Sequence, residues 1–309
     1  MAALFRKLVS IFRSLAAYVS VSLWVLLLAP GGMLLAFIFR SPGILYLLGR
    51  GGVRLGLATA GIRVHVDGYD CVQRLRGAVY CANHSSNLEP PIIYMALAAI
   101  HPKLKILYKS ELRAAIPILR NAFDMAGFVP IERRNTAQSS RAIERAALAL
   151  IEGDSFMIFP EGTRSRTGEL LPFKKGGFLM AIKGHAPIVP VAISGARTAM
   201  VKGSPVIYPV TVTVKIGKPI ETDELEVTER NSLIRETRSS LESLLGGVTD
   251  HPHKTKASRV ITATLSTRIS LVHWDQARIH PLLSCITSQV GTNGTEKLLA
   301  GSHIMATWP

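Results

Sequence analysis

One long apolar run near the N-terminus constrains this chain more than any other feature. Residues 14–39 contain no charged side chain. About 20 apolar residues suffice to cross the hydrocarbon core of a bilayer, so the run is long enough for a membrane helix. Residues 1–60 carry no acidic side chain, and basic residues flank the run on both sides. Since basic flanks stay on the cytoplasmic side, both ends of the run favour the same side of the membrane.

A short segment in the middle of this run, Pro30-Gly31-Gly32, predicts an interruption of the helix. Proline removes a helical N–H donor, and glycine favours turns. We therefore expect residues 1–60 to form a helical hairpin embedded in the membrane, with the rest of the chain on the cytoplasmic side. A cleaved signal peptide is the alternative, but such peptides have a shorter apolar core and no basic distal flank.

The composition points to an anionic partner. The 309 residues carry a formal net charge of +15, and 48% of them are hydrophobic. Lipid headgroups, phosphorylated substrates and nucleic acid all suit such a charge. The hydrophobic content favours an anionic membrane surface, and we expect no nucleic-acid partner. The widely spaced Cys71, Cys81 and Cys285 suggest neither a disulfide framework nor a metal site, and they suit a reducing compartment.

From residue 61 onward, short β-rich runs alternate with amphipathic helical segments. This alternation predicts an α/β domain over residues 61–247, with a mixed, largely buried sheet flanked by helices. The expected strands are residues 62–66, 78–82, 105–109, 127–131, 155–159, 188–193 and 211–216. The expected helices are residues 137–152, 175–185 and 223–245.

The C-terminal segment, residues 248–309, shows no continuing apolar period. It holds five of the nine histidines, so a metal-binding tail is one interpretation. The lack of a periodic apolar face favours a disordered or non-native extension instead. We therefore place this tail outside the functional core.

A histidine and a glutamate follow the strand expected at residues 78–82. They are His84 and Glu89, and two prolines come directly after the glutamate. Strand ends hold the functional groups of many α/β proteins. A carboxylate that meets one imidazole nitrogen raises the basicity of the other, so this pair could form a general base. A structural histidine and a first-turn helix glutamate are the plainer alternative.

The segment F-P-E-G-T-R-S-R follows the strand expected at residues 155–159. A turn that carries Glu161, Gly162, Thr163 and Arg164 combines backbone N–H groups, a hydroxyl and a guanidinium. Such a combination suits a phosphate or another charged headgroup. A surface turn with a salt bridge is the alternative. The chain has no Walker pattern at these glycines, which argues against a nucleotide site.

Two further basic segments lie near expected strand and helix ends. G-F-V-P-I-E-R-R delivers Arg133 and Arg134 to the end of a strand, where an arginine could clamp a phosphate. L-P-F-K-K-G-G-F places Lys174 and Lys175 before a helix, where they could face either the substrate or the membrane.

Taken together, these motifs resemble the four blocks of the glycerolipid acyltransferases. N-H-x-x-x-x-E, G-F-V-P-I-E-R, F-P-E-G-T-R and I-V-P-V-A-I occur in the order and rough spacing of that family, over about residues 61–245. The chain resembles the 1-acyl-sn-glycerol-3-phosphate (lysophosphatidic acid) acyltransferases in particular. It departs from their pattern at Glu89, where the family usually has aspartate.

The resemblance implies a role for each matching residue. In that family the histidine of the first block is the general base and the acid of that block orients it, which assigns these roles to His84 and Glu89. The residues that we expect to hold the glycerophosphate of the acceptor are Arg133, Glu161, Gly162, Thr163, Arg164 and Lys174.

The implied activity is transfer of a fatty acyl group from an acyl-CoA or acyl carrier protein thioester to the sn-2 hydroxyl of 1-acyl-sn-glycerol-3-phosphate, giving phosphatidic acid. This chemistry requires no metal, no cofactor and no covalent acyl-enzyme. Another acceptor, such as glycerol-3-phosphate or a different lysophospholipid, remains a rival. A lipase or thioesterase is disfavoured because the chain lacks a G-x-S-x-G nucleophile elbow. A non-enzymatic protein that binds anionic lipids would leave the His84–Glu89 pair unexplained.

Overall fold

The computed structural model describes residues 2–109, 117–131, 136–246 and 259–261. Arg133 and most of the C-terminal tail therefore lie outside the described residues. The helices are α1 (Ala2–Ile38), α2 (Gly43–Ala60), α3 (Glu89–Ala96), α5 (Pro117–Met125), α6 (Thr136–Ile151), α7 (Gly176–Lys183), α8 (Ala196–Ala199) and α9 (Arg230–Gly246). Short 3-10 turns are η1 (Tyr69–Cys71), η2 (Ala98–Ile100) and η3 (Val227–Glu229).

One mixed sheet organises the described part of the chain. Its strands are β1 (Arg63–Asp67), β2 (Val79–Ala82), β3 (Leu104–Lys109), β4 (Val129–Ile131), β5 (Ser155–Ile158), β6 (Ile188–Ser194), β7 (Thr211–Ile216) and β8 (Arg259–Ile261). Their order is β4-β3-β5-β2-β6-β7-β1-β8. The β6–β7 and β1–β8 pairs are antiparallel and the others parallel. All seven expected strands are thus confirmed, whereas β8 was not predicted.

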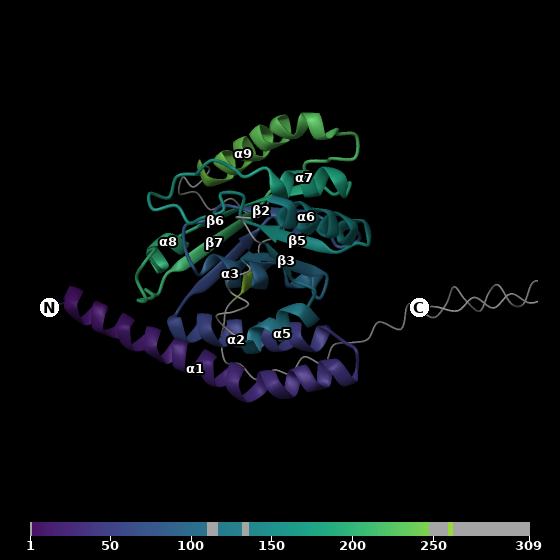
Figure 1. Cartoon of the computed structure of the whole chain (residues 1–309). Coiled ribbons are helices and arrows are strands. Elements are labelled where there is room, and N and C mark those ends of the chain that lie inside the picture. The colour runs from purple at the N-terminus through teal and green to yellow at the C-terminus, as the bar shows by residue number, and fades with distance from the viewer. Residues whose placement is uncertain (1, 110–116, 132–135, 247–258, 262–309) are drawn as a thin grey trace, which may run out of the picture. The chain divides into compact units, whose positions relative to one another are not determined.

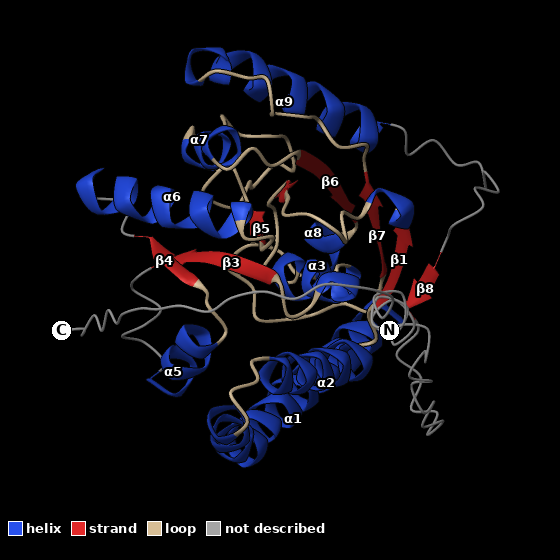
Figure 2. Cartoon of the chain, turned by 90° about the vertical axis from the view of Figure 1, so that its right-hand side faces the viewer, coloured by secondary structure: helices blue, strands red, loops and turns tan. Residues whose placement is uncertain are grey.

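Helices cover both faces of the sheet (Figure 2). Along β2, Val79 and Cys81 are buried with residues of α6, α7 and α9, while Tyr80 and Ala82 are buried with residues of α2 and α3. A strand that is apolar on both sides reads as a continuous hydrophobic run, and this explains the A-V-Y-C-A segment. The helix expected from residue 223 begins at Arg230, because η3 precedes it.

The two N-terminal helices correct one prediction. The helix does not break at Pro30: α1 runs continuously through this residue, and α2 follows after a turn at residues 39–42 (Figure 1). A proline removes only one helical N–H, and apolar helices tolerate that loss when the surrounding bonds are kept. The hairpin therefore turns about ten residues later than predicted.

Glycines in this hairpin serve helix packing rather than turning. A Cβ on Gly51 would come within 2.4 Å of the Trp24 ring, and one on Gly32 would come within 2.0 Å of Leu48. The Trp24 indole N–H also donates to the Leu48 carbonyl at 3.1 Å. Small residues let two helices approach closely, which accounts for Gly32 and Gly51, whereas a Cβ on Gly31 would meet nothing within 4 Å.

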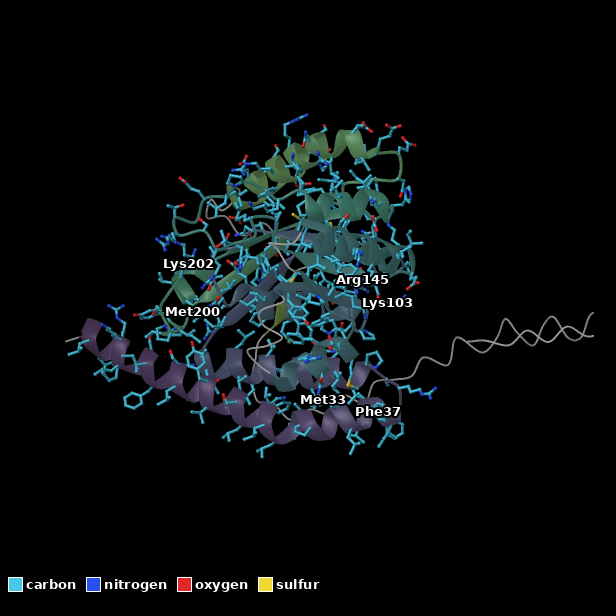
Figure 3. The ribbon with its side chains drawn as sticks, viewed as in Figure 1. Met33, Phe37, Lys103, Arg145, Met200 and Lys202 are labelled. Atoms are coloured by element: carbon cyan, nitrogen blue, oxygen red, sulfur yellow. The ribbon has the colours of Figure 1, made fainter. Side chains whose placement is uncertain are left out.

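One helix in the described residues is long and apolar enough to cross a membrane, namely Leu4–Ile38. Much of its surface is apolar and exposed; Phe37, for example, is 75% exposed (Figure 3). The first half of α1 also contacts the α/β domain, because Ser14 Oγ accepts the Ile207 N–H at 2.8 Å and the Tyr18 hydroxyl donates to the Pro205 carbonyl at 2.7 Å.

Candidate active site

The predicted site residues gather at the carboxyl ends of neighbouring parallel strands. β2 lies between β5 and β6 and is parallel to both. His84 comes just after β2, and Glu161 comes just after β5. Asn83 joins the loop after β2 to β6, since its side chain accepts the Ile193 N–H at 2.7 Å and donates to the Ile193 carbonyl at 3.0 Å. The loops that carry the first and third motifs therefore meet at one edge of the sheet.

His84 and Glu89 form the pair that their spacing predicted. Nδ1 of His84 lies 2.7 Å from Oε2 of Glu89. Glu89 opens α3, and the prolines at 90 and 91 occupy its first turn, where a missing N–H costs no helical bond. Because the carboxylate faces Nδ1, it favours the tautomer with the proton on that nitrogen. Nε2 has no hydrogen-bond partner among the described residues and is left to act as a base.

The Glu89 carboxylate is fully buried and held by several donors. Besides His84, it accepts the Ser85 N–H at 2.8 and 3.0 Å and the Ser85 hydroxyl at 2.7 Å. A buried carboxylate needs such bonds to offset its lost hydration. The longer glutamate side chain, the one departure from the family pattern, thus still reaches the imidazole.

The carboxylate of Glu161, a residue expected to bind the acceptor, is bonded to backbone N–H groups. Its side chain is buried, at 3% exposure. One carboxylate oxygen accepts the His84 N–H at 2.7 Å, and the other accepts the Leu171 N–H at 3.0 Å. Burial raises the pKa of this carboxyl, and the two backbone N–H groups oppose that rise.

The turn after Glu161 holds the other third-motif residues. Gly162 has φ +69°, in the left-handed region that favours glycine, and Thr163 is exposed. The Arg164 side chain has no acidic partner among the described residues, and Lys202 donates to its carbonyl at 2.7 Å. Lys174 is exposed, and its backbone N–H donates to the Pro160 carbonyl at 2.7 Å. Arg133 lies outside the described residues.

Several contributors to this site were not predicted. Ser85 resembled an ordinary turn residue, yet its side chain bonds the Glu89 carboxylate. Phe159 stacks on His84, with ring centroids 4.1 Å apart. Lys202 comes from a distant segment and gave no local signal. Ser85 lies inside the H-x-x-x-x-E motif, and that position was the one available signal for it. The contacts of Phe159 with His84 and of Lys202 with the Arg164 turn appear only in the folded chain.

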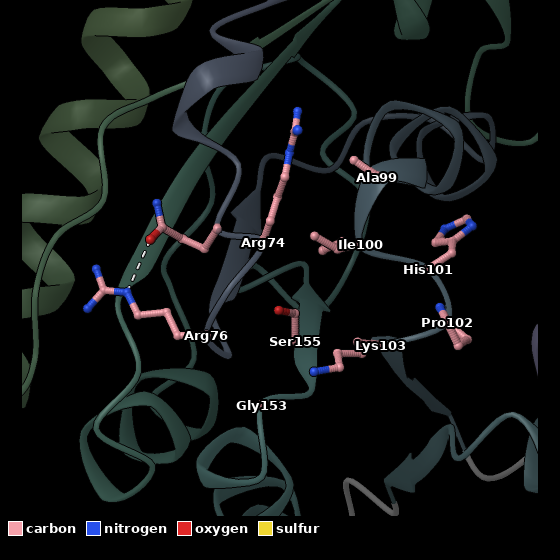
Figure 4. Close-up of a pocket in the computed structure, with 10 residues that line it drawn as sticks. Arg74, Arg76, Ala99, Ile100, His101, Pro102, Lys103, Gly153 and Ser155 are labelled. Carbon is pink, nitrogen blue, oxygen red and sulfur yellow. Dashed lines mark hydrogen bonds between the residues drawn. The ribbon is translucent and has the colours of Figure 1, made fainter. Parts of the chain in front are cut away.

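A cavity of about 210 Å³ lies at the opposite end of the strands (Figure 4). Its lining includes residues that precede β3 and β5, whereas His84 follows the end of β2. Two of its cations already have partners: Arg76 pairs with Glu221 at 2.6 Å, and Arg74 lies over the Tyr69 ring at 5.2 Å. This cavity is therefore separate from the candidate active site.

The fold and the site together define an α/β domain with a histidine–carboxylate pair at its strand ends. Residues 63–194 match the family model described as acyltransferase, the similarity that the motifs predicted. The match covers β1 to β6 and includes both the His84 loop and the Glu161 turn.

Named relatives are more specific. The chain is 33% identical over 180 residues to a 1-acyl-sn-glycerol-3-phosphate acyltransferase of Limnanthes douglasii, a match that covers 57% of this chain and 60% of the relative. It is 34% identical over 158 residues to the Cocos nucifera enzyme of the same name, covering 51% of this chain and 50% of that one. The predicted resemblance is therefore confirmed, although the chain spans only 60% of the length of the Limnanthes relative.

A solved structure shares the fold. The crystal structure of the 1-acyl-sn-glycerophosphate acyltransferase PlsC from Thermotoga maritima superposes with a TM-score of 0.67 at 22% sequence identity. The superposition covers 80% of this chain and 100% of that chain. At this identity the comparison shows the architecture alone.

Proposed function

We propose that this protein is a membrane-bound O-acyltransferase that uses an acyl-CoA or acyl carrier protein thioester to acylate the sn-2 hydroxyl of 1-acyl-sn-glycerol-3-phosphate, giving phosphatidic acid. The observation that carries this proposal is the 2.7 Å contact between Nδ1 of His84 and Glu89, which leaves Nε2 without a partner among the described residues. Similarity to enzymes named for this reaction supports it.

The proposed reaction needs one proton carrier. Nε2 of His84 takes the proton from the acceptor hydroxyl as its oxygen attacks the thioester carbonyl. The new C–O ester bond forms, the C–S bond breaks, and the thiolate leaves with the proton that the imidazolium returns. Glu89 stabilises the imidazolium between these steps, and positioning of the acceptor supplies the rest of the rate enhancement.

We propose that the acceptor phosphate binds at the Arg164 turn. Arg164 has no acidic partner among the described residues, and Lys202 brings a second positive charge to the same turn. Arg133 is expected there from its motif. A phosphomonoester carries nearly two negative charges, so it suits a site with several cations better than a choline-capped phosphodiester does.

The test compares lysophosphatidic acid with lysophosphatidylcholine as acceptors. One lost charge-assisted hydrogen bond is worth about 1.5–3 kcal/mol, or roughly 10- to 150-fold in kcat/KM. We expect at least this preference for lysophosphatidic acid in the wild type, and Arg164→Ala should reduce it through the acceptor KM. Arg235→Ala, on the exposed side of α9, is the matched control. Equal use of both lipids by the wild type would contradict the proposal.

The same assay separates the rival activities. Glycerol-3-phosphate as the preferred acceptor would indicate the related acyltransferase reaction. Thioester loss that does not depend on any acceptor would indicate a thioesterase. Running acyl-CoA and acyl carrier protein donors in parallel identifies the donor.

We propose that α1 and α2 attach the protein to the membrane and keep the α/β domain on the cytoplasmic side. The exposed apolar surface of α1 supports the attachment. The contact of Ser14 with Ile207 places the start of the apolar run beside the α/β domain, as a same-side hairpin requires. Tags at residues 1 and 60 should both be cleaved by protease from the cytoplasmic side only. Cleavage of the two tags from opposite sides would contradict this topology.

A further inference from the structure

We infer that Glu161 is a positioning residue that fixes the backbone of His84, and not a ligand of the acceptor. This inference rests on the proposed acyl transfer, and it assigns to the third motif a different task from the one that the resemblance implied. Three observations carry it: the occupied carboxylate, its burial, and the way in which the third-motif loop holds His84.

Both oxygens of the Glu161 carboxylate are already bonded to backbone N–H groups. One oxygen accepts the His84 N–H at 2.7 Å, and the other accepts the Leu171 N–H at 3.0 Å. With the side chain only 3% exposed, an acceptor could reach it only by displacing these bonds. Each displaced N–H would become a buried donor without a partner, which is costly.

Charge argues in the same direction. The proposed acceptor carries a phosphate with nearly two negative charges, and the third-motif turn supplies Arg164 for it. A carboxylate beside that phosphate would repel it, whereas a carboxylate turned inward toward backbone N–H groups does not compete. Within the third motif, Glu161 thus faces inward and positions His84, whereas Arg164, three residues later, binds the phosphate.

His84 is held from both sides of its peptide backbone by one loop. Glu161 binds its N–H, and the Ser165 N–H donates to its carbonyl at 2.7 Å. Phe159 of the same loop stacks on the imidazole at 4.1 Å. With Glu89 bonded to Nδ1, these contacts fix both the position and the rotation of the ring.

The Leu171 bond gives Glu161 a second task. It ties the far end of the loop, at residue 171, to the same carboxylate that holds His84. The turn that carries Arg164 lies between these two attachment points in the sequence. Loss of the carboxylate should therefore loosen the base directly, and a displacement of about 1 Å at a catalytic group can cost roughly 100-fold in rate.

The experiment compares Glu161→Gln with Glu169→Gln, an exposed glutamate of the same loop. Glutamine keeps the size of the side chain but points an NH₂ group at one of the two backbone N–H donors. We expect Glu161→Gln to lower kcat about 10- to 100-fold with less than a threefold change in the acceptor KM. The kcat of Glu161→Asp, which keeps the charge but has a shorter side chain, should lie between those of Glu161→Gln and the wild type. Glu169→Gln should match the wild type.

Hydrogen exchange gives a readout that does not depend on activity. In Glu161→Gln, the amides of His84 and Leu171 should exchange faster than in the wild type, while those of Glu169→Gln should not change. A raised acceptor KM with unchanged kcat and unchanged exchange would overturn the inference in favour of acceptor binding. If the wild type transfers no acyl group, the proposed function fails, and the exchange measurement still decides whether Glu161 holds His84.

Discussion

Oε2 of Glu89 lies 2.7 Å from Nδ1 of His84, although the family that this chain resembles usually carries a shorter acid at this position. The longer side chain is accommodated because Ser85 binds the carboxylate through both its N–H and its hydroxyl. The pair is therefore built around a glutamate, with the serine as its support.

This arrangement predicts different results for two substitutions of Glu89. Glu89→Gln keeps the size but removes the charge that stabilises the imidazolium, so kcat should fall by about 10²–10⁴-fold, as for loss of the base itself. Glu89→Asp keeps the charge and should retain much more activity than Glu89→Gln. The measurement is kcat for both variants, with melting temperatures to confirm that they fold. Equal kcat for the two variants would mean that the charge is not required.

The contact of α1 with α2 predicts that the glycines of the hairpin differ in how well they tolerate substitution by a larger residue. A Cβ on Gly51 would meet the Trp24 ring at 2.4 Å, whereas one on Gly31 would meet nothing within 4 Å. Gly51→Leu should therefore separate the helices. The free energy of unfolding in detergent should fall by about 1–3 kcal/mol, the range typical of overpacking, and the melting temperature should fall with it. Gly31→Leu is the matched control and should be neutral. Equal melting temperatures for the two variants would contradict the packing described here.

His101 predicts a pH dependence of stability. Its ring packs 4.3 Å from Tyr94, and burial, followed by the charge of Arg50, lowers its pKa to about 4. The unfolded state has the ordinary pKa near 6.5 and binds the proton first, so folding stability should fall as the pH drops from about 6.5 towards 4. After allowance for partial exposure, the loss between pH 7 and 5 is about 1 kcal/mol.

His101→Phe removes this titration and keeps an aromatic ring in place. Melting temperatures of the wild type should therefore decline more between pH 7 and 5 than those of the variant. Parallel declines would show that other groups cause the acid sensitivity.

The sequence predicted the sheet better than it predicted the hairpin. Most of the seven expected strands carry residues that are buried on one or both faces, and local patterns report burial well. The expected break at Pro30 was wrong: α1 continues, and Gly32 packs against Leu48 of α2, a tertiary contact that local rules do not report. β8 has three residues and, among the described residues, pairs with β1 alone, so no apolar pattern predicted it.

For the site, the motifs located both loops but not their contacts. The spacing of His84 and Glu89 sufficed to predict their pairing, because the two residues are five positions apart and Glu89 lies in the first turn of the helix that follows. The motifs did not show that Glu161, which lies 77 residues from His84 in the sequence, accepts the His84 N–H, because no local rule reports such a contact. Long-range backbone contacts of this kind require the fold.

The most direct test of the account is the formation of phosphatidic acid from lysophosphatidic acid and an acyl thioester by the wild type and by His84→Ala. Removal of a general base should lower kcat by about 10²–10⁴-fold while the melting temperature stays close to that of the wild type. The thiol released should equal the phosphatidic acid formed and should require the acceptor. A His84→Ala protein that keeps more than a tenth of the wild-type rate would contradict the central claim that this histidine is the base.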